Sequence, residues 1–190
     1  MTNLKVLGFQ STRLTGPLPS EIGYLHNLQF AYLYDNQLSG SIPTEIGGFG
    51  ANTVSLHFYN NRFNGMLPSE LGLVTGMTEL QLANNTFEGR VPSEFGLLTN
   101  AYILYLSHNR DLNGTLPTEL EQLTNIAGFD ISDTSITGDV PSLLQDVQSS
   151  LSFERYYFNC SKHYPCPEDK PNPGTNAQYA KVPDEGDNGF

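Results

Sequence analysis

The chain has 190 residues, a formal net charge of −11 and 38% hydrophobic residues. The acidic balance excludes a nucleic-acid partner, because such a partner needs a basic surface that displaces counterions. No apolar run approaches the roughly 18 residues needed to cross a bilayer, so any membrane attachment would require a segment that this chain does not contain.

A segment built around one glycine recurs six times along the chain, and this repeat determines the expected fold. The repeated glycines follow one another at steps of 24, 25, 24, 25 and 24 residues. They are Gly16, Gly40, Gly65, Gly89, Gly114 and Gly138. The two longer steps are assigned to loop insertions, one within 47–52 and one at Arg110-Asp111. Because one repeat cannot bury its own apolar side, we expect the repeats to stack.

Each glycine is preceded by alternating apolar residues and then a polar residue, as in Leu28, Ala31, Leu33 and Asn36. The alternation is typical of a short strand with one buried face. The polar residues that end these strands are Thr12, Asn36, Asn61, Asn85, Asn109 and Thr134. Turned inward, they can satisfy backbone groups of adjacent coils, which predicts a ladder that is weaker at its two Thr ends.

Each of the first five glycines is followed by Pro, Ser or Thr, and Glu, as in Pro19-Ser20-Glu21. These residue types favour the start of a helix, with the hydroxyl as a cap and the carboxylate in the first turn. A second glycine a few residues later is expected to end the short helical turn; these glycines are Gly23, Gly47, Gly72 and Gly96.

Segments such as LSGSIPTEIG, which begins at Leu38, resemble the 24-residue plant-type leucine-rich repeat with its L-x-G-x-I-P motif. The resemblance covers residues 1–144 as six repeats and implies an α/β solenoid, a right-handed superhelix. A parallel sheet would line its concave face, and short helical turns would lie on its convex side. The family has an N-terminal cap with its own cysteine pair, whereas this chain opens inside a repeat, so we expect the array to be truncated there.

The repeat pattern ends after Leu144, and residues 145–167 are expected to form a C-terminal cap. The resemblance implies a disulfide between Cys160 and Cys166, as in the family's cysteine cap. A zinc site that includes His163 is the alternative, but it would have only three plausible ligands. Residues 168–190 are rich in Pro, Gly and acidic residues, which predicts a disordered tail or linker.

Three N-glycosylation sequons begin at Asn84, Asn113 and Asn159. Such acceptors belong to surface segments of exported proteins, and together with the family resemblance they favour an extracellular location, secreted or at the cell surface. Asn113 is the strongest candidate of the three, because Asn84 lies beside the ladder residue Asn85.

The outward side chains of the strands make the expected binding surface, which is rich in aromatic residues. Exposed aromatic clusters mark interaction sites, although Tyr also packs well across neighbouring strands without any ligand. The candidate ligand-binding residues are Phe30, Tyr32, Tyr34, Asp35, His57, Tyr59, Gln81, Tyr105, His108 and Asp130.

These features favour a recognition module, a piece of a receptor-like protein, that binds a protein, peptide or glycan. The alternatives are a secreted inhibitor of a cell-wall-degrading enzyme and an adhesive or ice-binding structural protein. Neither a nucleophile–base pair nor a phosphate-binding loop is recognisable, so we expect no enzymatic activity, no cofactor and no metal ion.

Overall fold

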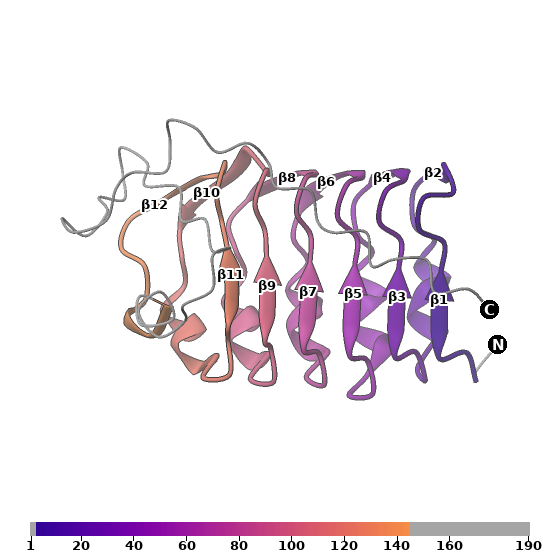
Figure 1. The fold of residues 1–190 in the computed structure, drawn as a ribbon, viewed down its shortest axis with the longest axis horizontal. Helices are drawn as coiled ribbons and strands as arrows, with labels where there is room; N and C mark the ends of the chain where they lie inside the picture. Colours follow the sequence, from indigo (N-terminus) through magenta and orange to yellow (C-terminus); the bar gives the residue numbers. More distant parts are fainter. Residues whose placement is uncertain (1–2, 145–190) are drawn as a thin grey trace, which may run out of the picture. The chain divides into compact units, whose positions relative to one another are not determined.

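The computed structural model describes residues 3–144, which contain all six predicted repeats. Figure 1 shows these residues as a row of similar coils, each beginning with a short strand of one shared sheet. The predicted cap and tail, with Cys160, Cys166, His163 and Asn159, lie outside the described residues.

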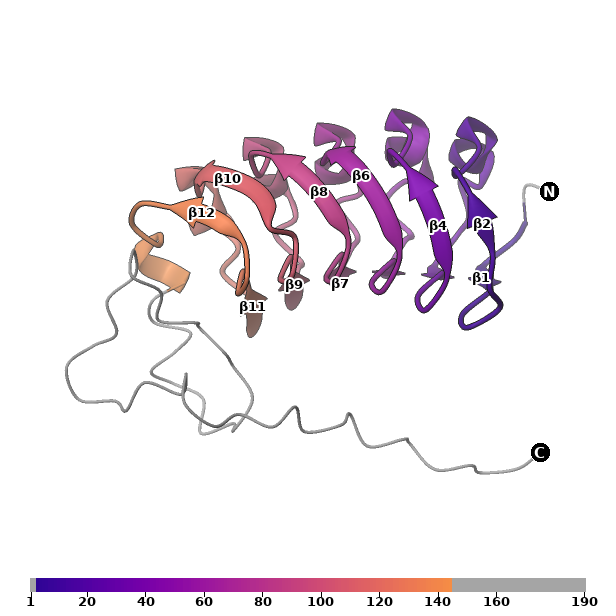
Figure 2. The ribbon, with the colours of Figure 1, turned by 90° about the horizontal axis from the view of Figure 1, so that it is seen from above.

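The first sheet contains one strand from each coil, and it confirms the predicted parallel sheet. Its order is β1-β3-β5-β7-β9-β11, so each strand pairs with those of the preceding and following coils. The strands are β1 (Val6–Gly8), β3 (Phe30–Tyr32), β5 (Ser55–His57), β7 (Glu79–Gln81), β9 (Ile103–Tyr105) and β11 (Gly128–Asp130). The helical turns are spread more widely than these strands in Figure 2, which places the first sheet on the inner side of the bend.

A second parallel sheet, which the sequence analysis did not predict, is built from the segments around the repeated glycines. Its order is β12-β10-β8-β6-β4-β2, and Figure 2 shows it between the first sheet and the helical turns. The strands are β2 (Thr15–Gly16), β4 (Gln37–Gly40), β6 (Arg62–Met66), β8 (Thr86–Gly89), β10 (Asp111–Thr115) and β12 (Ser135–Thr137). The available signal was an apolar residue two positions before each glycine. This residue is buried in the second to sixth coils, as Phe63 and Phe87 are.

The helical turns on the opposite side are 3₁₀ helices. They are η1 (Ser20–Tyr24), η2 (Thr44–Phe49), η3 (Ser69–Leu73), η4 (Ser93–Leu97) and η5 (Thr118–Gln122). Within residues 3–144, no helix has the length and apolar character that a membrane span requires.

The predicted role of the Ser and Thr hydroxyls as helix caps is wrong. A proline precedes each turn, and no side chain caps it. The hydroxyl lies instead against the next carboxylate, as between Ser93 Oγ and Glu94 Oε2 at 3.3 Å. Proline fixes φ near the value that a helix start needs, so the turn begins without a side-chain cap.

The predicted role of the second glycine is also wrong, because Gly72 and Gly96 lie inside the 3₁₀ helices and do not end them. A Cβ atom added at Gly72 would overlap the carbonyl group of Glu94 in the next coil, and one at Gly96 would overlap that of Glu119. These glycines therefore allow adjacent turns to approach closely.

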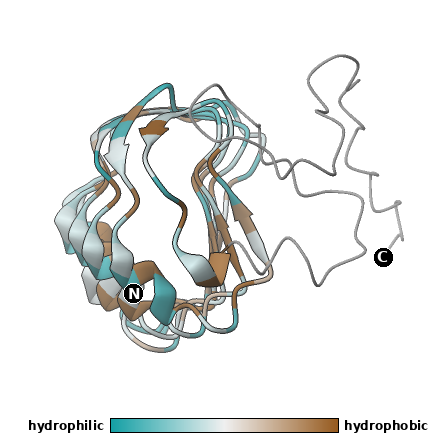
Figure 3. Ribbon diagram, turned by 90° about the vertical axis from the view of Figure 1, so that its left-hand side faces the viewer, coloured by the Kyte–Doolittle hydropathy of each residue, from teal (hydrophilic) through white to brown (hydrophobic). Residues whose placement is uncertain are grey.

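The core lies between the two sheets and the helical turns, and buried apolar residues of every coil contribute to it. Figure 3 shows the coils end-on, with the ribbon brown at hydrophobic residues. Leu56, Leu80 and Leu104 occupy one inward column and are fully buried. The rings of Phe63 and Phe87 stack with centroids 6.3 Å apart. Because each coil covers the apolar side of its neighbour, the core is a property of the stack and not of a single repeat.

The Asn ladder is confirmed by the hydrogen bonds of its middle members. The amide nitrogen of Asn85 donates to the carbonyl oxygen of Phe58 in the preceding coil at 3.1 Å, and its Oδ1 accepts from the Phe63 N–H at 3.0 Å. Asn109 makes the corresponding bonds one coil later. At the C-terminal end of the ladder, the Thr134 hydroxyl donates within its own coil, to the carbonyl of Ile131 at 2.7 Å.

Candidate ligand-binding face

Four columns of side chains cover the outer face of the first sheet, in the register that the repeat predicts. Strand pairing aligns the first two columns, and backbone hydrogen bonds beyond the strands align the other two. In chain order the first column is Val6, Phe30, Ser55, Glu79, Ile103 and Gly128, and the second is Gly8, Tyr32, His57, Gln81, Tyr105 and Asp130. The third is Gln10, Tyr34, Tyr59, Ala83, Ser107 and Ser132, and the fourth is Ser11, Asp35, Asn60, Asn84, His108 and Asp133.

Five aromatic side chains from β3, β5 and the residues that follow these strands are in contact on this face. We call Phe30, Tyr32, Tyr34, His57 and Tyr59 the ring cluster. Tyr34 and Tyr59 stack with 4.6 Å between centroids and 7° between ring planes. The His57 ring lies 5.0 Å from that of Tyr32 and 6.2 Å from that of Tyr59. The cluster therefore forms one continuous aromatic surface across two coils.

The imidazole of His57 is held in place by polar contacts from the next coil. Its Nε2 lies 2.7 Å from Glu79 Oε2 and 3.3 Å from Gln81 Nε2. The His57 side chain is 16% exposed and that of Glu79 is 34% exposed. The carboxylate thus fixes the orientation of a ring that is itself packed among tyrosines.

Two phenols of the ring cluster, those of Tyr32 and Tyr59, have raised pKa values. Burial raises the pKa of Tyr59 to about 12, with contributions from Tyr34 and Asp35. Burial, followed by the charge of Glu79 and the proximity of Tyr34, raises the pKa of Tyr32. Both hydroxyls are therefore uncharged at neutral pH and able to donate hydrogen bonds.

The structure brings seven of the predicted site residues together with Glu79 around β3, β5 and β7. The other three predicted residues lie elsewhere. The assembled group consists of the ring cluster with Asp35, Glu79 and Gln81, of which only Glu79 was not among the predicted site residues. Tyr105 lies toward β11, where a Cβ atom at Gly128 would come within 3.0 Å of its hydroxyl oxygen. His108 and Asp130 also belong to these later coils.

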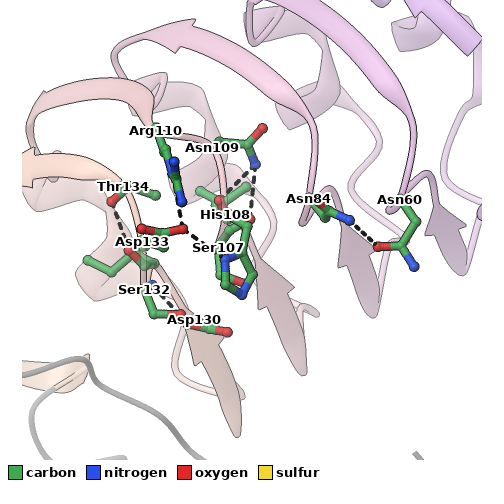
Figure 4. A network of polar contacts seen from close by, with 12 residues as sticks. Asn60, Asn84, Ser107, His108, Asn109, Arg110, Asp130, Ser132, Asp133 and Thr134 are labelled. Atoms are coloured by element: carbon green, nitrogen blue, oxygen red, sulfur yellow. Dashed lines mark hydrogen bonds and ion pairs between the residues drawn. The ribbon is translucent and has the colours of Figure 1, made fainter. Parts of the chain in front are cut away.

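The fourth outward column has a backbone conformation that the sequence analysis missed. All six of its residues have φ between 52° and 56°, the left-handed region in which Asn and Asp are enriched. The high Asn and Asp content of this column was the available signal. The conformation lets neighbouring side chains bond along the stack. Asn60 Nδ2 donates to Asp35 Oδ1 at 2.6 Å. Asn84 Nδ2 donates to Asn60 Oδ1 at 2.8 Å, the bond drawn in Figure 4.

A second polar group, around Asp133, lies near the end of the described residues (Figure 4). Asp133 Oδ2 lies 3.1 Å from His108 Nδ1 and 3.3 Å from Arg110 Nε. The hydrogen bond with His108 is the main cause that lowers the pKa of the Asp133 carboxyl, and Arg110 adds to it against a smaller opposing effect of burial. Both carboxylate contacts join coil six to coil five, so this group fastens the last coil.

The remaining predicted residues are the sequons. Asn84 is exposed, but its amide is part of the bonds along the fourth column. Asn113 is exposed on β10 and lines a shallow hollow of about 410 Å³ on the second sheet, with Met66, Glu88 and Arg110 among its other lining residues. Within residues 3–144, no group of three or more His, Cys, Asp or Glu side chains is arranged to hold a metal ion.

The fold resembles that of several plant proteins of known structure. Residues 27–49 match the family model described as Leucine Rich Repeat. The plant peptide hormone receptor RGFR1, solved in complex with RGF2, is 38% identical with a TM-score of 0.73, over 78% of this chain and 23% of the receptor chain. A chain of the BIR3–SERK2 complex from Arabidopsis thaliana is 31% identical with a TM-score of 0.63, over 72% of this chain and 71% of its own length.

A plant ice-binding protein is 28% identical with a TM-score of 0.68, over 73% of this chain and 44% of its own. No curated protein matches the chain. The chain belongs to the plant-type leucine-rich-repeat family, and it spans only 23% and 17% of the lengths of the first two receptor ectodomain chains that it matches.

Proposed function

We propose that this chain is part of an extracellular receptor-like protein that binds a protein or peptide through the outer face of the first sheet. The observation that carries the proposal is the ring cluster, in which Tyr34 and Tyr59 stack on a surface with no core to fill. Tyr offers a large contact area and a hydroxyl at low entropic cost, so it often anchors interfaces. The receptors RGFR1 and HAESA, solved with RGF2 and with IDA and SERK1, support the same class of ligand.

The test is selection of binders from a random-sequence peptide display library. The wild-type protein is expected to enrich peptides that the double variant Tyr34→Ser/Tyr59→Ser does not retain. For the best peptide, loss of these two anchors should weaken affinity about tenfold or more, with the melting temperature unchanged.

The control surface is the row of glutamates on the helical side. The double variant Glu45→Gln/Glu70→Gln lies opposite the ring cluster and should bind as the wild type does. Loss of binding in this variant, with binding retained in the Tyr variant, would move the site to the helical side and overturn the assignment.

Ice binding is the second candidate, because a plant ice-binding protein has a similar fold. An ice-binding surface would present one residue type at a regular spacing, whereas the third outward column holds Gln10, Tyr34, Ala83 and Ser132. We therefore expect no inhibition of ice recrystallisation. Inhibition of a cell-wall-degrading enzyme would use the same outer face, and an assay of polygalacturonase activity with and without the protein separates that role from peptide binding.

Location and glycosylation are parts of the same proposal. We expect a glycan at Asn113, because this side chain is exposed on β10 and lies away from the outer face of the first sheet. Mass spectrometry of the protein made in a plant secretory pathway, compared with Asn113→Gln, checks this expectation. An unmodified Asn113 in exported protein would contradict it.

A further inference from the structure

The outer face of the first sheet has a uniform sign of charge. Its four columns contain Asp35, Glu79, Asp130 and Asp133, and none of the column residues is Lys or Arg. The described cations nearest to these columns are Lys5, which precedes β1, and Arg13, Arg62 and Arg110, which each lie two residues beyond the fourth column. Arg110 contacts Asp133. A ligand segment that approaches the columns therefore meets carboxylates and aromatic rings.

Two of these carboxylates flank the ring cluster on opposite sides. Glu79 follows the cluster in the next coil, where it contacts His57 at 2.7 Å. Asp35 belongs to the same coil as Tyr34, and Asn60 Nδ2 donates to it at 2.6 Å. Their charges reach the phenols of Tyr32 and Tyr59, respectively. Cations are favoured at such a place, because the carboxylates and the negative faces of the rings attract them together.

One ring face is positioned to receive a planar cation. Tyr34 covers one face of the Tyr59 ring, with the two planes nearly parallel. The opposite face of the Tyr59 ring is turned toward the next coil. The third-column residue of that coil is Ala83, whose side chain is a single methyl group. A guanidinium group is planar and weakly hydrated, and it stacks on aromatic faces better than an ammonium group does.

We propose that the ligand contains a basic segment, and that an arginine of this segment stacks on Tyr59 above Ala83, on the face that carries the carboxylates of Asp35 and Glu79. This inference rests on the proposed peptide-binding function and specifies its ligand chemistry. Electrostatic attraction would also speed the approach of a basic peptide and make its affinity depend on salt concentration.

The experiment starts from the peptides that the wild type retains and Tyr34→Ser/Tyr59→Ser does not. Arginine should be enriched among them, and Asp and Glu depleted, relative to the input library. Replacing the enriched arginine by citrulline, which keeps the planar shape and removes the charge, should weaken the best peptide about fivefold.

The protein variants Glu79→Gln and Asp35→Asn test the carboxylates. Each replacement keeps an oxygen that can accept from His57 or Asn60, so the local hydrogen bonds are retained while the charge is lost. Each should weaken the arginine peptide about threefold at low salt, with a smaller difference at high salt. Glu45→Gln/Glu70→Gln removes two charges from the helical side and should leave the affinity unchanged.

The outcomes separate the two proposals. Wild-type-specific peptides without arginine enrichment, or unchanged affinity in Glu79→Gln and Asp35→Asn, would overturn the basic-segment inference while the binding function stands. The absence of wild-type-specific peptides would overturn both, as would a glycan-array ligand that depends on Tyr34 and Tyr59 when no peptide does.

Discussion

The rings of Tyr34 and Tyr59 stack with 4.6 Å between their centroids and 7° between their planes. This pair joins coils two and three on the proposed binding face. Burial of Tyr59 raises the pKa of its phenol to about 12, with smaller contributions from Tyr34 and Asp35.

The raised pKa of Tyr59 predicts that the free energy of unfolding decreases at alkaline pH. The pKa of Tyr59 is higher in the folded protein than its ordinary value of 10.0, so the contribution of its neutral phenol is fully present below about pH 10 and is lost as the pH rises toward about 12. Tyr59→Phe cannot ionise, and its melting temperature should fall less than that of the wild type over this range. Tyr24→Phe, at an exposed tyrosine of the helical side, controls for the loss of a hydroxyl group.

The lowered pKa of Asp133 predicts that the free energy of unfolding decreases as the pH falls. Its pKa in the folded protein is lower than the ordinary value of 3.8, so its contribution is present above about pH 4 and is lost as the pH falls through the lowered pKa. Asp133→Asn should reduce the free energy of unfolding at neutral pH by about 0–1 kcal/mol, as expected for an exposed ion pair. The difference from the wild type should vanish in strong acid, and a difference that persists there would contradict the electrostatic explanation.

The Asn ladder predicts that replacing a middle member destabilises the protein more than replacing a member at the end of the stack. Asn85→Leu and Asn109→Leu leave buried backbone groups without partners, at about 1–3 kcal/mol for each group. Thr134→Val removes only hydrogen bonds within the last coil, to the Ile131 carbonyl and from the Ile136 N–H, and should cost less. Denaturant unfolding of the three variants checks the order, and equal midpoints would show that enclosure by two coils does not matter.

The expected columns of the first sheet agree with the structure because a fixed repeat length sets the strand register. Tyr32, His57 and Gln81 occupy one column simply because equal steps of sequence return the chain to the same place in each coil. The second sheet was not predicted, because its apolar positions, such as Phe63 and Phe87, lie next to the repeated glycines and outside the alternating pattern that predicts the strands of the first sheet.

The contacts within the candidate site were less predictable. The repeat places Tyr105 in the same column as Tyr32, but its ring lies toward the space above Gly128 and away from the ring cluster. The left-handed conformation of His108 could not be read from its residue type, because His108 adopts it only through its position in the coil. Side-chain direction depends on the sizes of neighbours in adjacent coils, which a single repeat does not contain.

The glycines of the 3₁₀ helices predict that the same Gly-to-Ala substitution destabilises the protein to different extents at different turns. Gly72→Ala should reduce the free energy of unfolding by about 1–3 kcal/mol, because the new methyl group overlaps the carbonyl of Glu94. Gly47→Ala should cost less, since its Cβ would lie 3.2 Å from the carbonyl oxygen of Glu70. Thermal unfolding of both variants checks the difference, and a larger loss for Gly47→Ala would contradict it.

The extra residue of η2 (Thr44–Phe49) makes the approach of successive helical turns unequal. The junction between coils two and three, at Gly47 and Glu70, leaves more room than the tightly closed junction at Gly72. The same two coils supply Tyr34 and Tyr59 on the opposite side. The loops that follow the helical turns close this junction instead, because a Cβ atom added at Gly76 would overlap the carbonyl oxygen of Ala51. Coils two and three are thus held together at the stacked rings and at this loop contact.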